Sequence, residues 1–84
     1  MTVKQEDVLS AVLEAEVLED ISELRTDIKL TDQGIDSLGF YNILLVLEER
    51  YGVKIPDQDI GKLDTVADIA DYFNSRLGGR ARGP

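Results

Sequence analysis

The pentapeptide GIDSL, residues 34–38, places an acidic residue and a serine side by side just before a strongly apolar segment. Asp36 can cap the helix that this segment predicts, because a carboxylate accepts hydrogen bonds from the free N–H groups of a first helical turn. Ser37 then becomes the first helical residue. Its hydroxyl could act as a nucleophile, a phosphorylation site, part of a helix cap or an attachment point for a larger group.

Catalysis by this serine is disfavoured by what the chain lacks. A serine nucleophile needs a base within hydrogen-bond reach, and the sequence contains no histidine and no Ser-x-x-Lys arrangement. With no cysteine there is also no disulfide, no thiolate zinc site and no thiol nucleophile. We therefore do not expect an enzyme, and no residue is predicted to be catalytic.

A calcium-binding loop that starts at Asp32 also fails. Its third, sixth and twelfth positions would be Gly34, Ser37 and Ile43. The EF-hand pattern requires an oxygen ligand, a glycine and a glutamate at these positions. No protein metal site is predicted.

Attachment of a phosphate-linked group to Ser37 remains. A helix N-terminus presents unpaired N–H groups and partial positive charge, so it accommodates a phosphate well. Asp36 beside a phosphate is unfavourable unless a divalent cation bridges the two during transfer. Such a cation would explain why the acid and the serine occur together.

Two segments precede this motif. Residues 3–18 predict a first helix, with Thr2 as N-cap and Gln5 completing a capping box. Residues 19–36 predict a long loop strapped across the core, in which Gly34 takes a backbone angle that other residues resist. The expected core face of the helix is Val8, Leu9, Val12, Leu13 and Val17, and the expected anchors of the loop are Ile21, Leu24, Ile28, Leu30 and Ile35.

The second helix is predicted over residues 37–51, with Gly52 in the helix-ending position. It has too many apolar residues for a single core-facing stripe, so some must face outward and offer a partner surface, unless the helix is packed on several sides. Phe40 is expected to be buried. The apolar residues are Leu38, Phe40, Tyr41, Ile43, Leu44, Leu45, Val46 and Leu47.

Two further helices complete the fold. Pro56 predicts a short helix near residues 57–62, and Thr65 with Asp68 predicts a capping box at the start of the last helix. The core face of that helix is Val66, Ile69, Ala70, Phe73 and Leu77. We predict an all-α, small four-helix bundle: one domain over residues 1–77, with three main helices and one short helix, followed by a flexible tail over residues 78–84.

The charge is strongly negative. The net charge is −8, with ten acids and three bases in residues 1–36. Such a surface repels nucleic acid and anionic lipid and attracts basic protein faces, although acidity also simply keeps a small protein soluble. No apolar run approaches the roughly 20 residues that span a bilayer, and the N-terminus lacks a signal-peptide pattern. We expect a cytoplasmic monomer with no nucleic-acid or membrane partner.

Taken together, GIDSL, the helix that ends in LEERYG, the Ile55–Pro56 pair eighteen residues after Ser37 and the late segment TVADIADYF resemble the acyl carrier protein family, of the stand-alone type. The resemblance covers residues 3–77. It implies that Ser37 receives 4′-phosphopantetheine from coenzyme A, through a phosphopantetheinyl transferase and Mg²⁺ that Asp36 helps to organise. The arm would carry acyl groups as thioesters.

The resemblance also implies partners: an acyltransferase, ligase or synthase that loads and unloads the arm. Two positions commonly acidic in fatty-acid carriers are Gly39 and Asn42 here, so a more apolar interface and a dedicated pathway such as polyketide synthesis are expected. The alternatives are an aminoacyl or peptidyl carrier loaded by an adenylating enzyme, or an unmodified acidic adaptor. The expected partner-binding residues are Leu38, Tyr41, Asn42, Leu45, Glu48 and Glu49.

Overall fold

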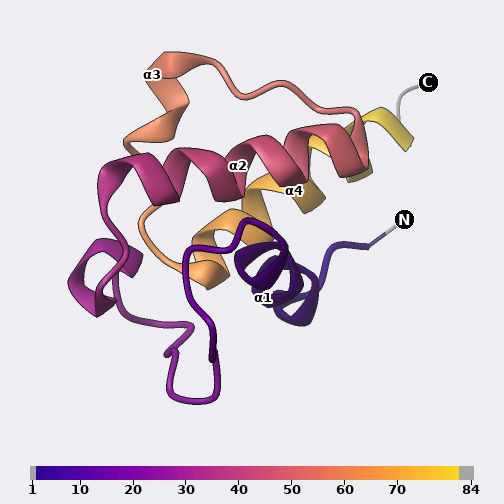
Figure 1. Cartoon of the computed structure of the whole chain (residues 1–84). Coiled ribbons are helices and arrows are strands. Elements are labelled where there is room, and N and C mark those ends of the chain that lie inside the picture. Colours follow the sequence, from indigo (N-terminus) through magenta and orange to yellow (C-terminus); the bar gives the residue numbers. More distant parts are fainter. Residues whose placement is uncertain (1, 82–84) are drawn as a thin grey trace.

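The computed structural model of the chain describes residues 2–81. Its elements are α1 (Gln5–Glu14), the 3₁₀ helix η1 (Leu30–Gln33), α2 (Ser37–Tyr51), α3 (Asp57–Ile60) and α4 (Val66–Ala81), with no strand in this range. Helix α1 packs against both α2 and α4, and the short α3 lies in the segment that returns from the end of α2 to the start of α4 (Figure 1). The predicted all-α bundle of three main helices and one short helix is confirmed.

The core is aliphatic, and two phenylalanines complete it. Phe40 from α2 and Phe73 from α4 are buried among leucine, isoleucine and valine side chains. No buried side-chain polar atom among the described residues lacks a hydrogen-bond partner. The interior is therefore held by apolar burial, which contributes roughly 25 cal/mol for each Å² removed from water.

Helix α1 is shorter than predicted at both ends. Its N-cap is Lys4, whose N–H donates to Asp7 Oδ2 at 2.8 Å, so the Thr2–Gln5 capping box was wrong. The reason lies in Val3, whose N–H and carbonyl are both held by the side-chain amide of Asn74, at 2.6 and 2.8 Å. This contact keeps the chain extended where the sequence pattern continues a helix.

The other end of α1 stops at Glu14 because the backbone turns left-handed at Glu16, with φ 60°. Residues 15–18 are consequently non-helical, although Val17 still packs against the core. Leu13 does not: 43% of it is exposed, so its assignment to the core face was wrong. A left-handed backbone angle is uncommon for a residue other than glycine, and no sequence pattern predicted one at Glu16.

The long loop between α1 and α2 is strapped to the bundle, as predicted, but by fewer anchors. Leu30 and Ile35 are buried and Ile21 and Leu24 are partly buried, whereas Ile28 is 39% exposed and is not an anchor. Two backbone hydrogen bonds hold the loop to the bundle instead. Leu30 N–H donates to the Asp64 carbonyl at 2.9 Å, and Ala67 N–H donates to the Thr26 carbonyl at 3.1 Å.

Around the loop's tip, the side chain of Gln33 closes residues 25–33 into a compact unit. Its Nε2 donates to the carbonyls of Arg25 and Ile28, both at 2.9 Å, and its Oε1 accepts from Arg25 N–H at 2.7 Å. These bonds satisfy backbone groups that have no ladder or helix partner. The loop therefore presents a defined surface to the start of α2.

The last two helices begin largely as predicted. Pro56 caps α3, which ends at Ile60, two residues earlier than expected. Asp68 N–H donates to Thr65 Oγ1 at 3.0 Å and Thr65 N–H donates to Asp68 Oδ2 at 3.4 Å, which confirms the capping box. Helix α4 continues to Ala81, past the expected end at Leu77. Residues 82–84 of the predicted tail lie outside the described residues.

Candidate functional site

The Asp36–Ser37 pair sits where the loop enters α2. Gly34 has φ 91°, a left-handed angle that favours glycine, and Ile35 is buried directly after it. Asp36 Oδ1 then accepts a hydrogen bond from Gly39 N–H at 2.8 Å, which confirms Asp36 as the N-cap. The turn and the anchor together aim the first residue of α2, Ser37, away from the core.

Ser37 is exposed to solvent. Its side chain makes no hydrogen bond with any other described residue, so the hydroxyl is accessible to a reagent approaching from outside. The N–H groups of the first turn face the same end of the helix, and they favour a negatively charged substituent there.

Gly39 has a structural role that the sequence did not reveal. A Cβ placed on it would lie 2.9 Å from Val17 Cγ1, closer than real Cβ contacts, and 3.1 Å from Asp36 Oδ1, which is tighter than most of them. The loop that follows α1 therefore touches the first turn of α2 only because residue 39 has no side chain. A glycine inside a helix costs about 1 kcal/mol relative to alanine. A glycine at position 39 of a predicted helix was therefore the sign in the sequence that this position has a packing role.

We expect Gly39→Ala to destabilise the fold by about 1 kcal/mol. Overpacking against the stiff, β-branched Val17 costs about 1–3 kcal/mol, which outweighs the helix-propensity gain of about 1 kcal/mol. Urea unfolding of the variant measures the difference. The matched control is Gly61→Ala, because nothing lies within 4 Å of a Cβ at Gly61.

A double variant tests whether the loss of stability in Gly39→Ala comes from a clash with Val17. Removing the two methyl groups of Val17 in the double variant Val17→Ala/Gly39→Ala should recover part of the loss, so the two changes should not be additive. Two results would contradict a close contact between Val17 and residue 39. One is an equal loss of unfolding free energy in Gly61→Ala, and the other is strict additivity of the Val17→Ala and Gly39→Ala effects.

The outward face of α2 is apolar. Leu38, Tyr41 and Leu45 are 70, 48 and 54% exposed, while the other face buries Phe40 and its neighbours in the core. The three lie three and four residues apart, so they form one stripe along the helix. The prediction that part of the apolar surplus faces outward is confirmed.

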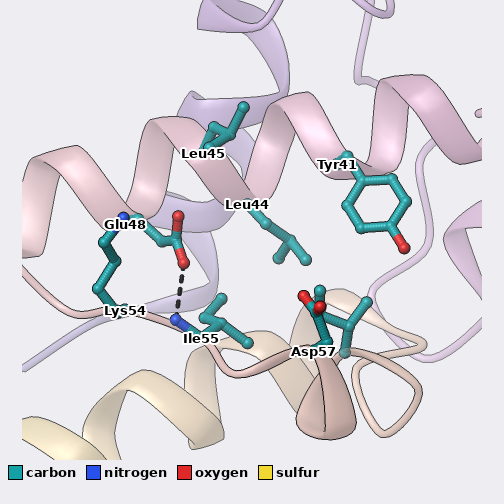
Figure 2. Close-up of a pocket in the computed structure, with 8 residues that line it drawn as sticks. Tyr41, Leu44, Leu45, Glu48, Lys54, Ile55 and Asp57 are labelled. Atoms are coloured by element: carbon teal, nitrogen blue, oxygen red, sulfur yellow. Dashed lines mark hydrogen bonds between the residues drawn. The ribbon is translucent and has the colours of Figure 1, made fainter.

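The polar residues predicted at this surface differ in availability. Asn42 and Glu49 are exposed, but Glu48 is half-buried and its Oε2 accepts from Ile55 N–H at 2.6 Å. Figure 2 shows this bond beside a hollow of about 270 Å³ between α2 and α3, whose wall includes Tyr41, Leu44 and Lys54. The carboxylate of Glu48 thus fixes the chain after α2.

Helix α3 is held to α4 by a hydrogen bond. The hydroxyl of Tyr72 donates to Asp59 Oδ2 at 2.8 Å and accepts from Arg76 Nη1 at 2.7 Å. Burial, followed by this bond to Asp59, raises the pKa of Tyr72 above 10.0. The pKa is higher in the folded state, so the contribution to stability is complete below about pH 10 and is lost only as the pH rises through the folded value.

The residues that the structure describes contain neither a cluster of metal-binding side chains nor a helix suited to a membrane. No three histidine, cysteine, aspartate or glutamate side chains come close enough to hold a metal ion. In the same range no helix is long and apolar enough to cross a membrane.

Comparison with known proteins identifies the class. Residues 7–73 match the family model described as a phosphopantetheine attachment site. The chain is 37% identical to the meromycolate extension acyl carrier protein of Mycobacterium leprae, over 87% of this chain and 67% of that protein. It is 38% identical to an acyl carrier protein of Thermotoga maritima, over 70% of this chain and 74% of that one.

A solved structure agrees with these relatives. The solution structure of butyryl-ACP from the actinorhodin polyketide synthase of Streptomyces coelicolor superposes with a TM-score of 0.78 at 32% identity, and it covers 92% of this chain and 93% of that one. The chain belongs to the acyl carrier protein family.

Proteins of this family carry a 4′-phosphopantetheine group, and the residues around Ser37 fit one. The hydroxyl is exposed, it is on the first residue of a helix, and no described side chain is bonded to it. When attached, the group supplies a terminal thiol, which a chain without cysteine otherwise lacks.

Proposed function

We propose that Ser37 is the attachment point of 4′-phosphopantetheine and that the chain carries acyl groups on this arm between partner enzymes, without catalysing a reaction itself. The observation that carries the proposal is the exposed hydroxyl at the first position of α2, preceded by the capping carboxylate of Asp36. A nucleophilic serine is not supported, since no histidine exists anywhere in the sequence.

The direct test is intact-mass spectrometry. Protein incubated with coenzyme A, Mg²⁺ and a broad-specificity phosphopantetheinyl transferase should gain the mass of one phosphopantetheinyl group, and fragmentation should place that mass on Ser37. An unchanged mass under conditions that modify another carrier protein would favour the adaptor alternative.

Asp36 is proposed to help organise the Mg²⁺ of the transfer reaction. Its Oδ1 caps α2, so a variant must separate the cap from the charge. Asp36→Asn keeps a capping oxygen but loses the charge. We expect this variant to unfold at nearly the same temperature and to be modified at least tenfold more slowly. An unchanged rate at limiting Mg²⁺ would leave Asp36 with its capping role alone.

The pathway is proposed to be polyketide synthesis or related secondary metabolism. Two facts support this: the apolar outward face of α2, and the likeness to a carrier from a polyketide synthase. Two positions that are commonly acidic in fatty-acid carriers are occupied by Gly39 and Asn42 in this chain. An interface centred on Tyr41 and Leu45 relies more on buried apolar contacts.

Partner enzymes are proposed to bind the face formed by Leu38, Tyr41, Asn42 and Leu45, with Glu48 and Glu49 at its edge. Tyr41→Ala/Leu45→Ala should slow acyl transfer to the cognate synthase by at least tenfold, because apolar anchors carry most of the affinity of an interface. Transfer kinetics at several synthase concentrations would place the effect in binding.

The matched control for that double variant is Leu13→Ala. Leu13 is 43% exposed, close to the exposure of Tyr41, but it lies on α1. Its replacement should leave transfer unchanged. Equal slowing by both variants would point to a general loss of stability instead of a docking face.

A further inference from the structure

A hollow of about 330 Å³ lies beside Asp36, between the turn that follows α1 and the first turns of α2. Its apolar lining comes from both elements, with Ala15 and Val17 on one side and Leu38 on the other. Val17 is half-buried against the core, whereas 70% of Leu38 is exposed. The hollow therefore has an apolar base that the core holds in place and an apolar edge that faces solvent.

The polar side chains that line this hollow are acidic or neutral. Glu16 and Asp36 supply two carboxylates and Asn42 supplies an amide, and no lysine or arginine is found among the described residues of the lining. All three side chains are exposed, and within residues 2–81 they take part in one hydrogen bond, from Gly39 N–H to Asp36 Oδ1. The hollow thus offers hydrogen-bond acceptors and negative charge to a group from outside.

Glu16 occupies its place in the lining against the backbone preference of its residue type. Its φ of 60° is left-handed, a region that residues other than glycine adopt at a cost. The N–H of Glu16 donates to the Leu13 carbonyl at 3.0 Å, so the angle belongs to a hydrogen-bonded turn at the end of α1. A glycine would suit this turn better, but it would take one of the two carboxylates out of the hollow.

We infer that this hollow receives an arginine side chain from the synthase that takes the acyl group from the arm. The inference rests on the proposed carrier function, and it adds a charged contact to the apolar docking face of α2. The hollow and that face are continuous, because Leu38 and Asn42 belong to both. A partner that covers Leu38 therefore lies over the hollow as well.

Arginine matches both the shape and the charge of the hollow. Its aliphatic stem can pack along Val17 and Leu38 while its guanidinium stays at the exposed rim. The planar fork of N–H donors can bond to the carboxylates of Glu16 and Asp36 and to the amide oxygen of Asn42. Lysine carries a point charge without this fork, and an aliphatic side chain would cover both carboxylates without pairing them.

A small probe tests the side-chain preference without any partner enzyme. In amide and methyl NMR spectra of the chain, N-acetylarginine methylamide should shift the signals of Val17, Leu38 and Asn42 more than N-acetyllysine methylamide does at the same concentration. Glu16→Gln should reduce these shifts by about half or more. Equal shifts from the two probes, or shifts spread over all the acidic residues, would overturn the assignment of arginine to the hollow.

Transfer kinetics of the modified, acylated chain with its cognate synthase test the contact itself. Glu16→Gln removes a charge from the hollow, and Glu19→Gln removes the same charge from an exposed position outside its lining. We expect Glu16→Gln to raise KM by about fivefold or more with kcat nearly unchanged, because a docking contact stabilises the bound substrate and the transition state equally. Glu19→Gln should change KM by less than about twofold.

Glu16→Gly separates the contact from the stability of the fold. Glycine adopts the left-handed angle without strain, so Tm should rise by a few degrees while KM rises as it does in Glu16→Gln. A residue with a merely structural role would not give a more stable protein that docks more weakly. The increase of KM with added salt should also be shallower in both Glu16 variants, because they lack one of the charges that salt screens.

All variants should still gain the full phosphopantetheinyl mass, which tests the attachment to Ser37 separately. An unmodified wild-type chain would overturn the proposed carrier function and this inference with it. A fully modified chain in which Glu16→Gln has the wild-type KM, or raises KM no more than Glu19→Gln does, would overturn the arginine contact and leave the attachment intact.

Discussion

Replacing Ser37 with alanine is expected to abolish the gain of phosphopantetheinyl mass completely. The acceptor oxygen is lost, and no other serine directly follows an acidic residue that caps a helix. Stability should change by no more than about 0.5 kcal/mol, because Ser37 is exposed and alanine is a good helix former. Intact mass and thermal unfolding, measured on the same sample, check both halves of this expectation.

Ser75→Ala is the matched control for that experiment. Ser75 is also an exposed serine on a long helix, α4, yet it lies far along the chain from the capped turn. Its variant should be modified at the wild-type rate. Residual modification of Ser37→Ala would show that the transferase uses another hydroxyl and would remove the basis for placing the arm at α2.

The features that the sequence predicted correctly are those that depend on local chemistry. Asp36 and Gly52 mark the ends of α2, and Thr65 with Asp68 marks the start of α4, because a capping side chain bonds to backbone only a few residues away. The site motif lies at one of these caps. Its position was therefore readable without any knowledge of the tertiary structure.

The errors arose where distant residues decide the backbone. Helix α1 starts late because Asn74, seventy-one positions away, holds Val3 extended. The contact between Val17 and Gly39 likewise joins two elements whose approach depends on the left-handed turn at Glu16. Sequence periodicity reports which residues are apolar, but it does not report which segments meet.

The same distinction applies to a hollow beside Ser37, whose lining includes Phe40 of α2 and Ile60, Gly61 and Leu63 from the segment after it. Gly61 follows the short helix α3, whereas the sequence pattern placed it inside the helix predicted near residues 57–62. Only the fold shows that it faces the site motif, because Ile60 and Leu63 come back over Phe40 of α2. Residues that form the wall of this hollow are thus contributed by three segments that no local pattern connects.

Phe73→Ala is expected to have the largest effect on the fold itself. Phe73 is fully buried, and its ring centroid lies 5.8 Å from that of Tyr51 and 5.9 Å from that of Tyr72. Truncating a buried phenylalanine costs about 3–5 kcal/mol. A chain of this length has a total free energy of unfolding of roughly 4–13 kcal/mol, so most of it is at stake.

The expected result is a fall in Tm of about 12 °C or more. If the variant is already unfolded at 37 °C, no cooperative transition should be seen above that temperature. Asp71→Ala, at an exposed position of the same helix, should change Tm by only a few degrees. Phe73→Ala should also be modified poorly, but for a different reason from Ser37→Ala, since it keeps the hydroxyl and loses the folded helix that presents it. Normal modification of a Phe73→Ala protein that circular dichroism shows to be unfolded would mean that the transferase reads the local sequence around Ser37 and does not need the bundle.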